Sequence, residues 1–134
     1  NMNFPLLEYF HCDNNQLTSL PDNMNFPNLQ SFDCSNNKLT LLPVMNFPLL
    51  EYFHCDNNQL TTLNGGPISV GGDFSCSYNE LTSLDGVKFS SNIIELFLSQ
   101  NRITSLEGAE FPTNLTRLFL HINKILKNKN LLNF

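Results

Sequence analysis

Apolar residues along this chain recur at fixed distances from a repeated asparagine. The tetrapeptides NNQL, NNKL, NNQL, YNEL, QNRI and INKI carry this residue at Asn15, Asn37, Asn58, Asn79, Asn101 and Asn123. The intervals are 22, 21, 21, 22 and 22 residues, and apolar residues recur eight, five and three positions before each asparagine and two and five after it. A fixed period of this length is typical of stacked repeats. The sequence therefore predicts a solenoid of six rungs.

The positions just before each asparagine alternate between apolar and polar. In the first repeat, Leu7-x-x-Phe10-x-Cys12 ends with a period of two, which predicts a short strand with Phe10 and Cys12 on one face. Strands joined by return paths of about 20 residues run parallel, about 4.8 Å apart, so every repeat position becomes a column through the stack. The links PDNMNFP, PVMNFP and GAEFPTN favour turns, extended segments or 3₁₀ segments over full helices, because proline and asparagine interrupt them.

Five columns of apolar side chains form the predicted interior. The column five positions before the asparagine contains Phe10, Phe32, Phe53, Phe74, Leu96 and Leu118. The column three positions before it contains Cys12, Cys34, Cys55, Cys76, Leu98 and Leu120. After the asparagine come Leu17, Leu39, Leu60, Leu81, Ile103 and Ile125, then Leu20, Leu42, Leu63, Leu84 and Leu106. The return path adds Phe4, Phe26, Phe47, Ile68, Phe89 and Phe111. Four repeats combine a large Phe with a small Cys and the last two combine Leu with Leu, an exchange of nearly equal volume that suits a close-packed core.

These positions match L-x-x-L-x-L-x-x-N-x-L, so the chain resembles the leucine-rich repeat family from Leu7 to about Ile125. The short period, with LTSLP and LTLLP, is similar to the 20 to 22 residue repeats of bacterial effector proteins, giant-virus proteins and related cytosolic proteins. The resemblance implies a right-handed solenoid with a parallel sheet on its concave face and turn or 3₁₀ returns on its convex face. We expect one domain over residues 1–134, with rungs at about 5–26, 27–47, 48–68, 69–90, 91–112 and 113–134.

The repeated asparagine has a structural role in the family that the chain resembles. Its amide can bond the backbone of the turn after each strand, where an unpaired buried backbone group would be costly. We therefore expect the column Asn15, Asn37, Asn58, Asn79, Asn101 and Asn123, here called the Asn ladder, to be structural rather than functional.

Three places depart from the repeat. Gly71 stands where a leucine is expected, within NGGPISVGG, so this repeat lacks a core side chain unless Val70 turns inward. Asn128 also replaces a leucine, in an atypical last rung. The first repeat matches the pattern fully with only NMNFPL before it, which would leave the amino-terminal end of the stack open. We expect either a segment of a longer array or assembly with a partner through that end.

Charge disfavours nucleic acid as a partner. The formal net charge is −5, all twelve acidic residues lie between Glu8 and Glu110, and four of the seven basic residues lie in the last 18 positions. An acidic body repels phosphate backbones, and the basic tail is a small patch. No apolar run approaches the roughly 20 residues that cross a bilayer, so no membrane association is expected.

The four cysteines occupy one inward column, one in each of the first four repeats. A straight ladder of thiols cannot converge on a tetrahedral zinc ion, and core positions favour reduced cysteines over disulfides. Free thiols indicate a reducing compartment, so we expect a cytoplasmic protein, or one in the host cytoplasm or the virion if it is an effector or viral protein.

Residues between the inward positions point out of the other face of the sheet, where a partner would bind. We predict partner contacts at Tyr9, His11, Asp33, Tyr52, His54, Asp56, Asp73, Glu95, Phe97, Arg117, Phe119 and His121. His11, Asp33 and His54 stand in consecutive repeats beside Asp13 and Asp56, a set that offers imidazole and carboxylate ligands for zinc, nickel or copper. However, Met2–Thr18 and Met45–Thr61 are identical, so the second histidine is explained by duplication alone. We expect no metal and no cofactor.

Phe97 and Phe119 occupy the outward position in adjacent repeats, where the other four repeats have smaller or polar residues, and neighbouring outward aromatics are typical of a contact surface. Cysteines point inward and histidines outward, and no glycine-rich phosphate loop opens a helix, so no enzyme is expected. The sequence predicts a protein–protein interaction module, which the resemblance also implies. The alternatives are a structural subunit of a larger assembly such as a virus particle, and the substrate-recognition part of an effector enzyme whose catalytic domain lies elsewhere.

Overall fold

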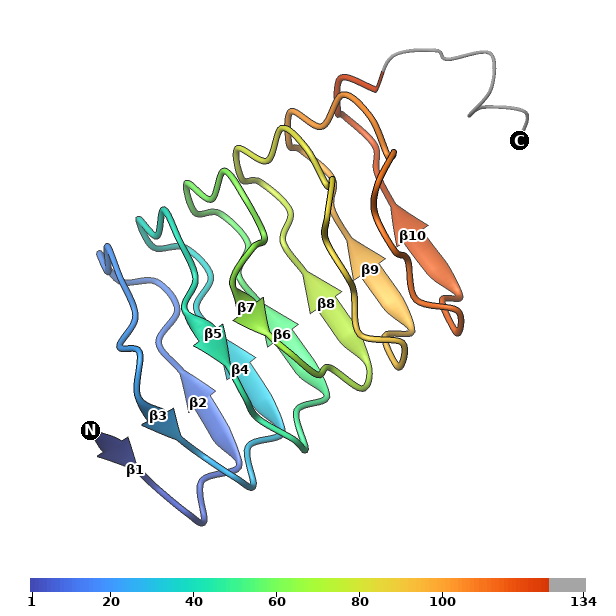
Figure 1. The fold of residues 1–134 in the computed structure, drawn as a ribbon. Helices are drawn as coiled ribbons and strands as arrows, with labels where there is room; N and C mark the ends of the chain where they lie inside the picture. The colour runs from blue at the N-terminus through green and yellow to red at the C-terminus, as the bar shows by residue number, and fades with distance from the viewer. Residues whose placement is uncertain (126–134) are drawn as a thin grey trace.

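The structure of the protein is a computed structural model that describes residues 1–125. One parallel sheet runs along the molecule, formed by one short strand per repeat (Figure 1). Its strands are β2 (Tyr9–His11), β4 (Ser31–Asp33), β6 (Tyr52–His54), β8 (Asp73–Ser75), β9 (Glu95–Phe97) and β10 (Arg117–Phe119), side by side in chain order. Residues 1–125 contain no helix, and the chain forms a parallel β-solenoid of about five turns.

The return segments form a second layer opposite the six-stranded sheet (Figure 1). Two pairs of very short parallel strands lie there: β1 (Met2–Asn3) with β3 (Met24–Asn25), and β5 (Val44–Met45) with β7 (Gly66–Pro67). A single bridge joins Lys88 to Glu110. The prediction of turns is confirmed, but the 3₁₀ segments are absent from residues 1–125 because the returns extend far enough to pair with one another.

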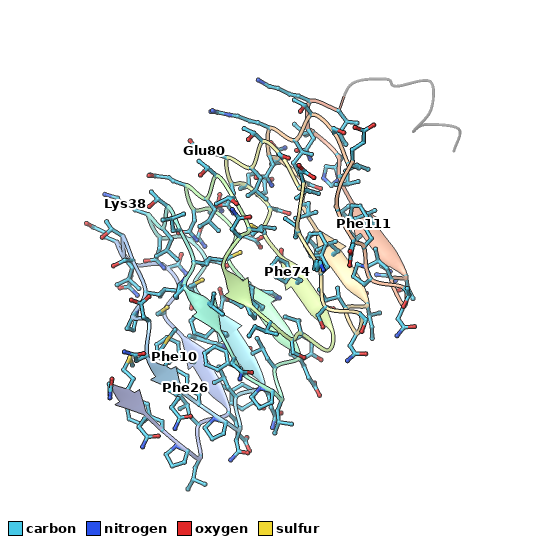
Figure 2. The ribbon with its side chains drawn as sticks, in the orientation of Figure 1. Phe10, Phe26, Lys38, Phe74, Glu80 and Phe111 are labelled. Carbon is cyan, nitrogen blue, oxygen red and sulfur yellow. The ribbon has the colours of Figure 1, made fainter. Side chains whose placement is uncertain are left out.

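The apolar columns fill the space between the two layers (Figure 2). Phe26, Phe47 and Phe53 are fully buried, and Phe32 is 1 % exposed. Their rings stack from one turn to the next, with centroids 5.6 Å apart between Phe26 and Phe47 and 5.7 Å apart between Phe32 and Phe53. Each buried ring adds roughly 1.5–3 kcal/mol of hydrophobic stabilisation, so the stack itself drives folding.

Three predicted core positions are wrong. Phe4 is 49 % exposed and Leu118 is 41 % exposed, because each lies in an outermost turn of the described part and has a neighbour on one side only. Ile68 is 61 % exposed although it lies in the middle of the chain, since the NGGPISVGG segment turns its side chain outward. The inward rotation of Val70 is confirmed: it is fully buried and replaces the missing leucine at Gly71. Asn128 lies outside the described residues.

The Asn ladder joins each turn of the solenoid to the one before it. The Asn58 amide nitrogen donates to the carbonyl of Cys55 in its own turn and to that of Cys34 in the preceding turn, both at 3.1 Å. Its Oδ1 accepts the backbone N–H of Leu39 at 2.9 Å. Asn37, Asn79, Asn101 and Asn123 repeat this arrangement. The predicted bond to the turn is confirmed, and the bonds between turns extend it.

All four cysteines are free thiols, and three of them are buried. Burial raises the pKa of Cys12 to about 11, with the carboxylates of Asp33 and Asp13 adding to the shift. Burial also raises the pKa values of Cys34 and Cys55. These thiols face the core and stay protonated at neutral pH.

Candidate binding surface

The outer sheet face comprises the side chains of the six-stranded sheet that point away from the core. Strand pairing in register places the predicted contact residues in rows across it. One row contains Tyr9, Ser31, Tyr52, Asp73, Glu95 and Arg117, and the other contains His11, Asp33, His54, Ser75, Phe97 and Phe119. Asp56 and His121 follow the strands on the same side. The structure therefore gathers all twelve predicted contact residues on one surface, although Tyr9 and Tyr52 are separated by Ser31 and form no joint patch.

Phe97 and Phe119 form a stacked aromatic pair on the outer sheet face. Their rings are 4.9 Å apart between centroids and nearly parallel, at 6°. Both side chains are partly exposed, and the rings of Phe119 and His121 are nearly perpendicular, with their centroids 6.4 Å apart. Beside them Arg117 Nη1 lies 3.6 Å from Glu95 Oε1, in an ion pair whose Arg117 side chain is 65 % exposed and whose Glu95 side chain is 26 % exposed. An apolar platform flanked by a charge pair is a suitable anchor for a side chain of a partner.

Asp56 is fixed by serines of neighbouring turns. Its Oδ1 accepts the Ser75 hydroxyl at 2.6 Å and the Ser77 backbone N–H at 2.7 Å, and its own N–H donates to Ser35 Oγ at 3.2 Å. Asp33 similarly accepts the N–H of Ser35 at 2.9 Å. These carboxylates therefore stabilise the ends of strands as well as presenting negative charge.

Sequence reasoning missed the part that serines play on this surface. Ser35, Ser75, Ser77 and Ser99 are all buried, and each makes a hydrogen bond to a neighbouring group. Their recurrence at the outward positions two and four before the asparagine was the available signal. Small hydroxyl residues there let the carboxylates and His121 bond across turns.

Two of the three histidines, His11 and His121, bond to serines. His11 Nε2 lies 3.0 Å from Ser31 Oγ, and His121 Nδ1 lies 2.9 Å from Ser99 Oγ. Within residues 1–125 no three side chains of His, Cys, Asp or Glu are grouped so that they could hold a metal ion. The row of His11, Asp33 and His54 is present in register, but His11 directs its Nε2 to a hydroxyl.

The comparisons with known proteins leave the family of this chain open. No protein-family model matches the chain, and no curated protein matches it. The part of the chain that the structure describes contains no helix long and apolar enough to cross a membrane.

Proposed function

We propose that this chain is a leucine-rich repeat protein of six right-handed rungs whose outer sheet face, the concave face of such a fold, binds a protein partner without catalysis. The parallel β-solenoid and the Asn ladder support this proposal, because both correspond to the repeat pattern. Stacked repeats present a long, rigid surface, which suits recognition of another protein. The free thiols support a reducing compartment such as the cytoplasm.

The stacked pair Phe97 and Phe119 is the observation that carries the proposal. Two parallel rings that remain partly exposed on a sheet face lose less entropy on binding than flexible side chains, because each has only two side-chain torsions and the stack already restricts them. Aromatic residues are frequent binding hot spots, and truncating one costs 2 kcal/mol or more at many interfaces. Glu95 and Asp73 on β9 and β8, with Asp56 and Asp33 farther along the outer sheet face, would then select partners with basic groups.

Affinity capture with wild-type protein and with the double variant Phe97→Ala/Phe119→Ala tests this role. We expect a partner captured by the wild type to bind the double variant at least tenfold more weakly. Tyr78→Ala is the matched control, since Tyr78 is a 54 % exposed aromatic residue that precedes a ladder asparagine and lies outside the two rows. Equal binding of the wild type and the double variant would remove this surface from the proposal.

A structural subunit is the second candidate, favoured by the exposure of the first turn. Phe4 is 49 % exposed beside β2, which has a neighbouring strand on one side only in residues 1–125, whereas the equivalent Phe47 is fully buried. A recognition module should be monomeric at micromolar concentration, whereas a subunit that uses this edge should associate. Light scattering over a concentration series separates the two functions.

A further inference from the structure

A cavity of about 390 Å³ lies on the return side of the solenoid, remote from the outer sheet face. It separates segment 64–70, which follows β6, from segment 86–90, which follows β8. Its walls include Leu63, Val70, Phe74, Val87, Phe89 and Ile93. Neither the repeat pattern nor the proposed protein recognition uses this space.

Proline in β7 explains why the two segments separate. Gly66 and Ile68 donate their N–H groups to Pro43 and Met45, on the side of β7 that pairs with β5. Pro67 between them would have to donate on the opposite side, and proline has no N–H. In the described part of the chain, no backbone hydrogen bond joins segment 64–70 to segment 86–90. The only hydrogen bond between them runs from Ser90 Oγ to the Val70 carbonyl, at 3.2 Å.

The cavity lies beside an interruption in the return column of phenylalanines, where Ile68 and Phe89 both line it. Phe26 stacks on Phe47 at 5.6 Å and Phe89 stacks on Phe111 at 5.7 Å, but the intermediate position is Ile68, which points outward. No aromatic contact joins Phe47 to Phe89 within residues 1–125. The column of rings is therefore interrupted at Ile68, next to the cavity.

The backbone cannot easily collapse into this space. A Cβ at Gly65 would lie within bonding distance of the Leu42 carbonyl oxygen, so the glycine backbone already packs directly against the preceding turn. The backbone hydrogen bonds of Gly66 and Ile68 to the preceding turn, both 2.9 Å, also hold β7 against β5. When a large side chain is missing from a core, the surrounding backbone relaxes only partially, and a void remains.

We propose that this cavity binds a small, neutral aromatic molecule of about the size of indole. A closed apolar cavity of about 150 Å³ accepts benzene, and the larger cavity here, which is partly open to solvent and is also lined by Asn64 and Lys88, has room for two fused rings. Phe74 and Phe89 meet at 83° with centroids 5.9 Å apart, so the walls offer both a ring face and a ring edge. The alternation of the strand turns the Pro67 carbonyl toward segment 86–90, where it can accept a hydrogen bond from an indole N–H.

Calorimetric titration of the full chain with indole tests the proposal. We expect saturable binding at one site, weakened at least tenfold by Val87→Phe, because Val87 is buried in the cavity wall and a phenyl ring there fills the space. Ile68 stands at the exposed mouth of the cavity, so the larger ring of Ile68→Trp should obstruct the mouth and have the same effect while leaving the buried wall unchanged. Leu41→Phe is the matched control: it adds a ring at another exposed aliphatic position and should leave the affinity unchanged.

Each remaining outcome decides against the cavity. If the wild type shows no saturable binding of indole, the proposal is overturned. An unchanged affinity for indole in Ile68→Trp also overturns it, and this variant is decisive if Val87→Phe does not fold. Equal weakening by Leu41→Phe would show that indole binds elsewhere. Phe97→Ala/Phe119→Ala should bind indole like the wild type, so the result is independent of the protein-binding proposal.

Discussion

The residue before each ladder asparagine has a left-handed backbone conformation. The φ angles lie between 53° and 57° at Asn14, Asn36, Asn57, Tyr78, Gln100 and Ile122. Asparagine tolerates this region better than most residues, whereas a β-branched side chain is strained there. The same turn is therefore built at low cost in the first three repeats and at a higher cost in the last.

Ile122→Asn should stabilise the protein by about 1 kcal/mol, because it relieves a strained β-branched residue at a site that is 64 % exposed. Urea unfolding measures the change. Ile94→Asn is the control for loss of an exposed isoleucine, since Ile94 is 43 % exposed and has no positive φ. A gain of the same size in both variants would mean that strain at Ile122 is not the cause.

Asn58→Ala should destabilise the protein by about 3 kcal/mol, because it removes several hydrogen bonds and leaves buried carbonyl groups without donors. Asn15→Ala, in an identical sequence context, should cost less than about 1 kcal/mol, because the Asn15 amide bonds only to the carbonyls of Cys12 and Asp13 in its own turn. Equal losses in thermal or urea unfolding would show that the bonds between turns contribute nothing.

For single residues, the sequence predicted the structural role of the Asn ladder but not its hydrogen bonds to the preceding turn. A single repeat shows only that asparagine is present, whereas the partners of Asn58 at Cys34 and Leu39 depend on how turns stack. The left-handed residues were missed as well. The doubled asparagine of NNQL and NNKL was the available signal, since a second asparagine suits a left-handed backbone.

Among the elements, segment 64–72 shows where the repeat pattern succeeds and where it fails. The pattern located the missing leucine at Gly71 and the compensating Val70 correctly, because a buried apolar position must be filled by a neighbour. It placed Ile68 inside, since counting positions cannot detect that Pro67 interrupts the pairing of return strands. The six sheet strands were predictable because alternation is local, but the two-residue return strands depend on contacts between turns.

Two glycines of this segment should respond differently to alanine. Gly65→Ala should cost about 2–4 kcal/mol, because its methyl group would overlap the Leu42 carbonyl oxygen. Gly71→Ala should be neutral or stabilise by up to about 1 kcal/mol, since its nearest contact, the Leu50 carbonyl oxygen, would be 3.6 Å away. Unfolding midpoints in urea compare the two variants directly. Similar midpoints would refute the close packing inferred at Gly65.

On the outer sheet face, the sequence predicted the rows of side chains but not how they are used. Register follows from a period that keeps each column aligned, so the contact of Phe97 with Phe119 could be anticipated. The hydrogen bonds of Asp56 to Ser75 and Ser77 could not be, because rotamers decide whether a carboxylate points to a neighbour or to solvent.

For the whole molecule, the column of buried thiols predicts a loss of stability in alkali. Folding raises the pKa values of Cys34 and Cys55, so above about pH 9 the unfolded chain releases protons that the folded chain keeps. Stability is therefore fully present below that pH and falls as the pH rises, by up to about 1.4 kcal/mol per pH unit for each such thiol.

Cys55→Ala isolates this effect from other alkaline titrations. Its free energy of unfolding should fall less steeply than that of the wild type between about pH 9 and 10.5, although it should be lower at pH 7 because of the cavity that the substitution leaves. Urea titrations at several pH values give both slopes. Parallel slopes would show that the Cys55 thiol ionises equally in the folded and unfolded states.

The identical segments Met2–Thr18 and Met45–Thr61 provide an internal comparison of what stacking contributes. Phe47 and Cys55 are fully buried, whereas Phe4 is 49 % exposed and Cys12 is half-buried. Because the two sequences are identical, the difference in burial comes from the turn that covers β6 and is absent beside β2 in the described part. Repeat proteins derive much of their stability from such interfaces between neighbouring units.

Hydrogen exchange should therefore differ between the two copies. Cys12 and Asn14 donate to the next turn as Cys55 and Asn57 do, at 2.8–3.0 Å, and their intrinsic exchange rates are the same because their neighbours in sequence are the same. We expect the first pair to exchange at least tenfold faster, because local opening at the β2 edge breaks contacts with one neighbour rather than two. Two-dimensional NMR must be used, since peptides from the two copies can have equal mass. Equal protection would mean that the solenoid opens only as a whole, and that its edge turn is as stable as its interior.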